Sequence, residues 1–305
     1  MSAPNAIAGL PPGYHIDCMT REEAGMLVEW ATAEGWNPGL HDLEVAWHYD
    51  REAFIALRAQ VGAGSPELVG GGVILSYAGR CGFMGLFIMR PDQRRQGIGR
   101  FLWHERLRRL QTRLQPGAFI GMDGVFDMVP FYAAGGFSVQ HRDLRFQGIA
   151  DATRLADAAD AGACELAAVP QSALVAYDEA VFGVPRGAFL QRWLEVPGGR
   201  GRAVYDPAEG KVRGYAFLRP CVSGYKFGPV FADDPGVART LMHDLLAGVP
   251  GEPVVLDVPE PNLAALAIVT ELGWNEAFGC ARMVLGSPPR DTTHRVFGVT
   301  SFEFG

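Results

Sequence analysis

The sequence predicts an α/β (α+β) fold in two domains, each with helices packed against a β-sheet. The first observation is an uninterrupted apolar run, 83–89, which is stopped by Arg90-Pro91-Asp92 and followed by a segment with helical periodicity. This is the pattern of a strand, a turn and a helix. The second is that the later half repeats this order in weaker form. The third is size, because 305 residues at 48% hydrophobic content exceed one average domain and can fill two cores.

The turn between this strand and helix predicts an anion site. The first amides of a helix have no intrahelical partner and lie at the positive end of the helix dipole. Gly97 and Gly99 leave no side chain in the way and tolerate the dihedral angles that a nest of amides requires. Arg94, Arg95 and Arg100 add positive charge. We therefore expect the turn to hold a multiply charged ligand such as a diphosphate.

Other phosphate loops fit this turn poorly. A mononucleotide P-loop needs Lys and then Ser or Thr after its last glycine, and the dinucleotide fingerprint needs a third glycine and a later acidic residue. This turn meets neither requirement. What remains is Arg94-x-x-Gly97-x-Gly99 behind a strand. This resembles the acetyl-coenzyme-A signature of the GNAT superfamily of N-acetyltransferases. The alternative is a basic surface turn that happens to contain two glycines, but the flanking strand and helix stand in the expected order.

The resemblance implies both a fold and a coenzyme site. The predicted order of strand, two helices, three strands, helix, strand, helix and final strands is the GNAT order, so each domain is expected to have a mixed, mostly antiparallel central sheet flanked by helices. In that family the central strand splays from its neighbour and binds the pantetheine arm and thioester through main-chain atoms. The positions assigned to acetyl-coenzyme A are Phe87, Ile88, Met89, Arg94, Arg95, Gln96, Gly97, Ile98, Gly99, Arg100 and Asp127.

A second segment agrees with the first. Residues 127–137 contain Tyr132 four residues before Gly136-Phe137, which resembles the GNAT helix that carries Tyr-x-x-x-Gly-Phe. In that family the tyrosine hydroxyl protonates the departing coenzyme thiolate. The resemblance therefore implies that Tyr132 is the general acid. The alternative is a core tyrosine whose hydroxyl is satisfied by the protein.

The general base is harder to assign. Direct attack of an amine on a thioester requires a group that accepts the amine proton. The central strand contains no Glu or Asp at 83–89, where some relatives carry a glutamate. Asp123, at the end of the next predicted strand, is the preferred candidate, although Asp-Gly at a strand end is also an ordinary turn signal. His41, Asp42 and His48 stay possible through bridging water.

The loop between the first two predicted helices is a candidate acceptor site. It reads Gly-Trp-Asn-Pro-Gly at 35–39, and in GNAT folds this segment flanks the acceptor amine. Trp36, Asn37 and Asp42 are therefore candidate substrate contacts. The alternative is a structural turn in which Trp36 is a hydrophobic plug and Asp42 a helix cap.

The stretch 148–162 is rich in Ala and Asp and lacks a strong helical periodicity of apolar residues, which marks it as the domain boundary. The predicted limits are a catalytic domain at 1–148, a linker at 149–162 and a second domain at 163–305. In the second domain the stretch 233–236 lacks the glycine signature, and Val269 occupies the place corresponding to Tyr132. We expect a degenerate GNAT-like domain that completes the acceptor pocket or forms an interface. Its candidate pocket residues are Tyr177, Asp178, Phe182, Tyr225 and Arg282.

The composition narrows the classes of partner and the compartment that we expect for this protein. A formal charge of -7 and a pI near 5.5 argue against a general nucleic-acid binder. No apolar run approaches the roughly 18 residues of a membrane span, and no signal sequence is evident. The five cysteines are scattered without a Cys-x-x-Cys pair, which favours a reducing cytoplasm. No clustered ligand set for a metal is present.

These observations predict a cytoplasmic acyltransferase that moves acetyl from acetyl-coenzyme A to a primary amine of a small molecule. We expect a monomer or homodimer with no metal, nucleic-acid or membrane partner. One alternative is acetylation of a protein lysine or N-terminus. The other is a coenzyme-binding sensor without turnover, against which the intact Tyr132 argues.

Overall fold

The structure, a computed structural model, describes residues 9–60, 62–158, 162–288 and 290–305. The first half follows the predicted order of elements. Its helices and strands are β1 (Tyr14–Cys18), α1 (Arg21–Ala33), α2 (Asp42–Tyr49), β2 (Phe54–Ala59), β3 (Glu67–Tyr77), β4 (Cys81–Met89), α3 (Gly99–Thr112), β5 (Phe119–Val125), α4 (Val129–Ala134) and β6 (Ser138–Ile149). Short 3-10 turns at Arg51–Ala53, Pro91–Gln93 and Phe126–Met128 lead into β2, the turn before α3, and α4.

The second half begins with a 3-10 segment at Ala152–Ala158, inside the predicted linker; residues 159–161 of that linker lie outside the described residues. The elements that follow are β7 (Ala163–Glu165), α5 (Gln171–Phe182), α6 (Gly187–Leu194), β8 (Arg200–Asp206), β9 (Lys211–Pro220), β10 (Tyr225–Ala232), α7 (Pro235–Ala247), β11 (Pro253–Pro259), α8 (Leu263–Glu271), β12 (Asn275–Leu285) and β13 (Val296–Gly298). The predicted repeat of a strand, a turn and a helix is confirmed by β10 and α7, and the strand β11 and the helix α8 follow them.

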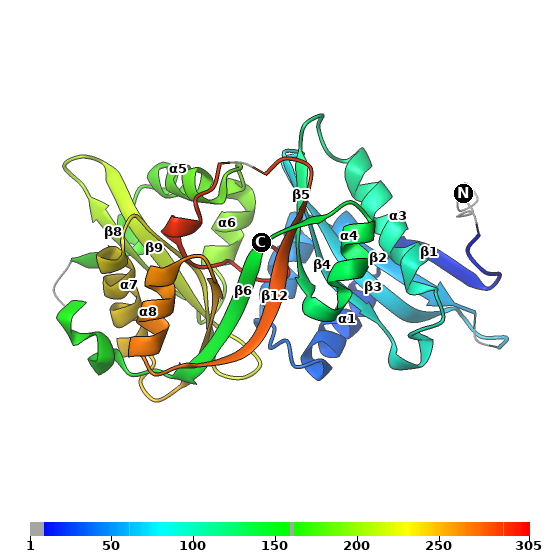
Figure 1. Cartoon of the computed structure of the whole chain (residues 1–305), viewed down its shortest axis with the longest axis horizontal. Coiled ribbons are helices and arrows are strands. Elements are labelled where there is room, and N and C mark those ends of the chain that lie inside the picture. Colours follow the sequence, from blue (N-terminus) through cyan, green and yellow to red (C-terminus); the bar gives the residue numbers. More distant parts are fainter. Residues whose placement is uncertain (1–8, 61, 159–161, 289) are drawn as a thin grey trace.

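Within the described residues, the strands of both halves form one sheet flanked by helices (Figure 1). The strand order is β1-β2-β3-β4-β5-β12-β6-β11-β10-β9-β8-β7, and β13 pairs with β10. The pairs β4–β5 and β10–β11 are parallel and the other neighbours are antiparallel. The predicted class, a mixed and mostly antiparallel sheet with helices, is confirmed.

The two halves exchange strands at the centre of this sheet. β12, from the second half, lies between β5 and β6, with Met283 opposite Met122. β6, from the first half, lies between β12 and β11, with Phe146 opposite Leu256. Figure 1 shows these two long strands, green and orange, side by side in the middle of the molecule. The second half therefore contributes a strand directly beside the first half's β5. We keep 1–148 and 163–305 as proposed domain limits along the sequence.

Helices cover both faces of the first half's sheet. A side chain at Gly71 of β3 would lie 3.3 Å from Leu27 of α1, whereas one at Gly72 would lie 2.6 Å from Nε of Arg106 on α3. Because successive strand residues point to opposite faces, α1 and α3 lie on opposite sides of the sheet. The glycines leave room for the helices to pack closely there.

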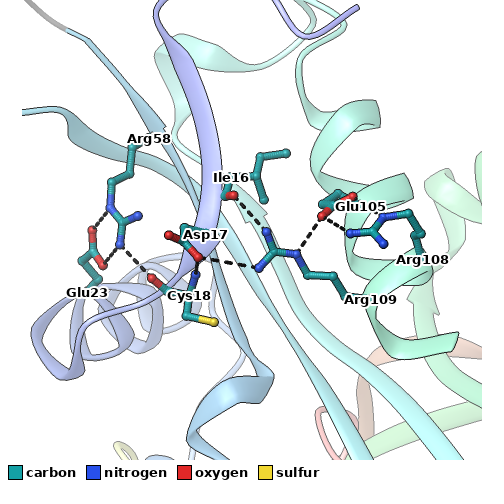
Figure 2. A network of polar contacts seen from close by, with 8 residues as sticks. All are labelled: Ile16, Asp17, Cys18, Glu23, Arg58, Glu105, Arg108 and Arg109. Carbon is teal, nitrogen blue, oxygen red and sulfur yellow. Dashed lines mark hydrogen bonds and ion pairs between the residues drawn. The ribbon is translucent and has the colours of Figure 1, made fainter. Parts of the chain in front are cut away.

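A polar network fastens the edge strand β1 to both helices (Figure 2). Arg58 of β2 donates to both carboxylate oxygens of Glu23, which caps α1, and to the carbonyl of Cys18. On the other side, Arg109 of α3 donates to Glu105 at 2.7 Å and to the carbonyl of Ile16 at 2.9 Å. The network therefore ties α3, whose first residue is Gly99, to the sheet. None of the helices in the described ranges is both long and apolar enough to cross a bilayer.

Candidate active site

A cavity of about 810 Å³ lies along β4 and reaches into both halves of the protein. One end is formed by the glycine turn before α3, including Gly97 and Gly99. The middle is formed by β4 and by Tyr132 of α4. The other end, beside Gly85 of β4, is formed by residues of β12 and the last residues of the sequence, and Trp36 and residues of β6 also line the cavity. A single space therefore joins the predicted anion site to the predicted acceptor side.

The middle of the cavity opens because β4 and β5 diverge. Their parallel pairing covers only Cys81, Gly82 and Phe83 of β4, whereas pairing of β4 with β3 continues to Met89. A bulge lies at the point of divergence, where Leu86 has a φ of 49° and the β3–β4 register shifts. Beyond Phe83, the main-chain edge of β4 that faces β5 is therefore not paired with that strand.

Arg106 of α3 hydrogen-bonds the main chain at this bulge. Its side chain is fully buried and donates to the carbonyls of Val73 and Gly85, each at 2.7 Å, while it lies over the ring of Phe87. Burial lowers the pKa of the Arg106 guanidinium to about 10. A positive charge is thus held beneath the cavity without a carboxylate partner among the described residues.

The glycine turn forms an amide nest at the start of α3. Arg95 and Gly97 have φ angles of 62° and 77°, the left-handed values that turn successive amides toward one side. Within the described ranges, the backbone N–H groups of 95–100 have no hydrogen-bond acceptor, whereas those of Arg94 and Phe101 bond to carbonyls. The Arg94 side chain holds the turn by donating to the carbonyl of Met89 at 2.8 Å and pairing with Glu34.

The residues assigned to the coenzyme from the sequence divide into two groups. Those that line the cavity are Phe87, Ile88, Met89, Arg94, Arg95, Gly97, Gly99 and Arg100. Three others do not line it in the described structure. Ile98 is buried in the core, Gln96 donates to the carbonyl of Asp92, and Asp127 is exposed beyond the end of β5.

Tyr132 is buried, but its hydroxyl is unpaired within the part of the chain that the structure describes. Only 4% of the residue is exposed, its ring stacks on Trp103, and the absence of a side chain at Gly124 leaves room for it. Burial raises the pKa of the Tyr132 hydroxyl to about 12, although the nearby charge of Arg106 opposes this shift. No described residue hydrogen-bonds the hydroxyl, and Tyr132 lines the cavity. The hydroxyl is therefore protonated at neutral pH and available to a ligand.

Two family comparisons agree with this geometry. Residues 20–137 match a model described as "Acetyltransferase (GNAT) family", and residues 174–298 match one described as "Acetyltransferase (GNAT) domain". Together they cover most of the sequence. The chain belongs to the GNAT acetyltransferase family. It is a tandem GNAT protein and an acyltransferase, as predicted.

Relatives match the tandem GNAT protein over nearly its whole length. A holothin acyltransferase of Pseudoalteromonas sp. (strain SANK 73390) is 29% identical over 285 residues, covering 93% of this chain and 92% of that protein. A putative acetyltransferase from Pyrococcus horikoshii superposes with a TM-score of 0.76 at 20% identity, covering 97% of both chains. A tandem GNAT protein from the clavulanic acid biosynthesis pathway gives a TM-score of 0.61 at 16% identity, covering 91% of this chain and 100% of that one. Both of these solved structures have the same fold as this protein.

Asp123 of this GNAT protein is engaged in a buried ion pair. Arg282, opposite it on β12, donates to its two carboxylate oxygens at 2.7 and 2.8 Å. Asp143 and His141 of β6 lie in the same cluster, because Asp143 is 3.3 Å from both Arg282 and His141. Burial, and then the neighbouring Asp143, raise the pKa of Asp123 even though Arg282 opposes them. Since its side chain is fully covered, Asp123 borders the cavity through its main chain.

Among the predicted acceptor contacts, Trp36 lines the cavity. Its carbonyl accepts a hydrogen bond of 2.7 Å from Arg145 of β6. Asn37 and Asp42 do not line the cavity in the described structure. Asn37, at a φ of 50°, hydrogen-bonds the main chain of Ser223 in the β9–β10 turn, and Asp42 forms a buried bidentate pair with Arg219 of β9. These two residues join the first half to the second.

Within the described residues, the candidates from the second half do not line this cavity either. The Tyr177 hydroxyl donates to the carbonyl of Arg213, and Tyr225 packs against the core of the second half. Asp178 pairs with Arg186, while Phe182 and Arg282 line a smaller cavity of about 320 Å³. His41 and His48 do not line the larger cavity either.

The second half lines the cavity with residues that the sequence did not indicate: Phe278, Cys280, Phe302 and Glu303. Phe278 and Cys280 belong to the exchanged strand β12. No spacing pattern links them to the glycine turn, because their position follows from the strand exchange. Glu303 had one local signal, as the lone carboxylate between two phenylalanines. The described residues contain no group of three or more His, Cys, Asp or Glu side chains that could hold a metal, and the absence of a metal stays a prediction.

Proposed function

We propose that the protein is an N-acetyltransferase that moves acetyl from acetyl-coenzyme A to the primary amine of a small molecule. The observation that carries the proposal is one continuous cavity that joins the amide nest, the free edge of β4 and the unpaired hydroxyl of Tyr132. An acyl-coenzyme donor needs these three features in this order along its length.

The amide nest suits the diphosphate of the donor. The free N–H groups of 95–100 and the start of α3 favour negative charge, and the exposed Arg95 and Arg100 add charge-assisted contacts. The free edge of β4 would hold the pantetheine arm through main-chain hydrogen bonds. From Met89 back to Gly85 this edge extends roughly 13 Å, so the thioester of a donor bound in this way would lie near the centre of the cavity.

Tyr132 would act as the general acid. When the amine nitrogen forms its bond to the acetyl carbon, the carbon–sulfur bond breaks and its electron pair stays on sulfur. The Tyr132 hydroxyl then gives its proton to that sulfur, and the nitrogen returns a proton to the phenolate through water. The raised pKa keeps Tyr132 protonated at neutral pH, and the buried charge of Arg106 would stabilise the transient phenolate.

The acceptor side favours a small molecule over a protein segment. Trp36, Phe278, Cys280 and Phe302, drawn from both halves, enclose it. The names of two relatives agree: one is a holothin acyltransferase and the other belongs to the clavulanic acid biosynthesis pathway. We therefore propose that the second half completes the acceptor pocket.

The test is thiol release from acetyl-coenzyme A across a panel of amines, with mass spectrometry for the added acetyl group. We expect Tyr132→Phe to lower the rate by roughly 10²- to 10⁴-fold, the range of general acid catalysis, and to leave calorimetric coenzyme affinity unchanged. Tyr205→Phe, in β8, is the matched control and should keep the wild-type rate. Absence of coenzyme binding, or a fully active Tyr132→Phe, would refute the proposal.

A further inference from the structure

Glu303 lies at the acceptor end of the cavity, and its carboxylate has no partner among the described residues. Only 5% of the residue is exposed, and it lines the cavity beside Phe302 and Cys280. Its Oε2 is completely covered yet receives no hydrogen bond. Neither carboxylate oxygen has a donor or an ion-pair partner within 4.0 Å in the described part of the protein. A buried carboxylate without a donor is costly unless a ligand or water satisfies it.

A tight turn at residues 301–305 fixes the position of Glu303. The Ser301 hydroxyl oxygen accepts hydrogen bonds from the amides of Glu303 and Phe304, at 3.2 and 3.0 Å. The hydroxyl of Tyr77 donates to the carbonyl of Phe304 at 2.6 Å, and the Phe304 ring packs between Phe189 and Trp193 in the core. The segment is therefore anchored on both sides of the carboxylate.

The same segment lies directly against β4. A side chain at Gly85 would come within 2.8 Å of the backbone carbonyl carbon of Glu303 and within 2.9 Å of its Cα, so glycine is what allows this approach. Gly85 adjoins the bulge at Leu86, where β4 has left β5. Glu303 is thus placed beside the stretch of β4 at which the proposed thioester would lie.

Charged groups surround Glu303 on several elements. Arg145 of β6 lies over the ring of Phe302 and is paired bidentately with Asp257 of β11. Lys226 of β10 is fully buried, and its Nζ has no hydrogen-bond partner among the described residues. Burial, and then the charge of Arg145, lower the pKa of Lys226, whereas Glu303 raises it. Burial raises the pKa of Cys280, the remaining titratable neighbour, so its thiol is neutral.

We propose that Glu303 is the catalytic base, which binds the acceptor as its ammonium ion and removes one proton from it. This rests on the proposed function and names the acceptor as a positively charged amine. The ammonium gives a proton to the carboxylate, which leaves a neutral amine with its lone pair directed at the thioester. After acetyl transfer Glu303 releases that proton to water, so each turnover yields one proton, the amide and the free thiol.

Glu303 fits this role better than Asp123. Both oxygens of Asp123 are held by Arg282, and its side chain is closed off from the cavity. Glu303 lines the cavity, and its carboxylate has no hydrogen-bond donor among the described residues. The base therefore comes from the second half of the protein, while the acid, Tyr132, comes from the first.

The test compares Glu303→Gln, which keeps the shape of the side chain, with wild type on amines of different pKa. At neutral pH we expect kcat/KM to fall by at least about 100-fold. The variant can use only the neutral amine present in solution, so its rate should rise about tenfold per pH unit up to the amine's own pKa. Glu303→Asp should recover part of the rate. Glu276→Gln, on the exposed part of β12, is the control for the substitution and should keep wild-type kinetics.

The outcomes separate this inference from the proposed function. Wild-type transfer together with a slow, steeply pH-dependent Glu303→Gln that binds coenzyme A normally supports the role of Glu303. Wild-type transfer with an equally active Glu303→Gln overturns it, and so does a rate loss whose pH dependence matches that of wild type. If Glu303→Gln fails to fold, a Glu303→Asp variant that folds and shows the wild-type rate at every pH also overturns it. Wild type that neither binds coenzyme nor transfers acetyl refutes the proposed function itself.

Discussion

Substitution of Gly85 by Ala tests how closely the 301–305 segment is packed against β4. The new methyl group would clash with the backbone carbonyl oxygen of Glu303 and would lie 2.8 Å from its carbonyl carbon, whereas ordinary contact begins at 3.4 Å. The neighbouring atoms belong to the backbone, so no rotamer change relieves the clash. The segment must therefore move by at least 0.6 Å, the difference between 3.4 and 2.8 Å.

Two effects follow from that shift. Overpacking of this kind costs about 1–3 kcal/mol, and we expect the free energy of unfolding in urea to fall by that amount. Because Glu303 moves away from the reacting centre, we also expect acetyl transfer to fall roughly 10- to 100-fold. Calorimetric affinity for coenzyme A should change little, since the amide nest lies at the opposite end of the cavity.

Gly25→Ala is the control for this substitution. Gly25 lies within α1, and a methyl group there would be 3.7 Å from the nearest atom, Nη1 of Arg21, which is ordinary contact. We expect stability to rise by up to about 1 kcal/mol because alanine favours helix, with unchanged transfer. A Gly85→Ala variant with wild-type stability and wild-type transfer would show that the segment is not packed against β4 as described.

Two further substitutions probe the joint between the halves and the amide nest. Asp42→Asn leaves Arg219 buried without its partner and should cost about 3–5 kcal/mol of unfolding free energy. Burial alone would raise the pKa of Asp42, but Arg219 outweighs it and holds that pKa below the ordinary value of 3.8. The stability that the Asp42 carboxylate contributes is therefore present above pH 3.8 and is lost as the pH falls through its lower folded pKa. The free energies of unfolding of variant and wild type in urea should consequently converge in acid. A difference that stays constant with pH would contradict this reasoning. Gly97→Asp adds negative charge and strain at a φ of 77° and should weaken calorimetric coenzyme A affinity at least about tenfold, whereas unchanged affinity would exclude the nest.

Local features of the sequence carried most of the fold prediction for the first half. The capping box of Thr20 and Glu23, a pattern of four consecutive residues, begins α1, and the apolar run 83–89 lies within β4 as predicted. The glycine turn leads into α3 as predicted. Each of these depends on residues close together in the sequence, so propensity and turn chemistry were sufficient to place them.

The strand exchange could not be predicted in the same way. The pairing of Arg282 with Asp123 joins residues 159 positions apart, and nothing in either segment specifies the other. β12 has the alternating character of many strands, so its neighbours in the sheet are set by the packing of both halves together. For this reason Asp123 was an attractive base in the sequence, although the structure engages it in an ion pair.

Glu303 was missed for a related reason. A lone carboxylate at the end of the sequence gives no spacing relation to the glycine turn or to Tyr132. Its position depends on Gly85, Ser301 and Tyr77, which the fold brings together. The acid was recognisable because its motif is continuous in the sequence, whereas the proposed base depends on tertiary structure.

Titration calorimetry of the wild-type protein with coenzyme A and with pantetheine, which lacks the diphosphate, tests the central claim most directly. The unpaired amides of 95–100 and the arginines beside them predict that coenzyme A binds at least about 100-fold more tightly than pantetheine, since charge-assisted hydrogen bonds to the diphosphate supply the difference. Equal affinities for the two compounds, or no measurable binding of coenzyme A, would contradict the account.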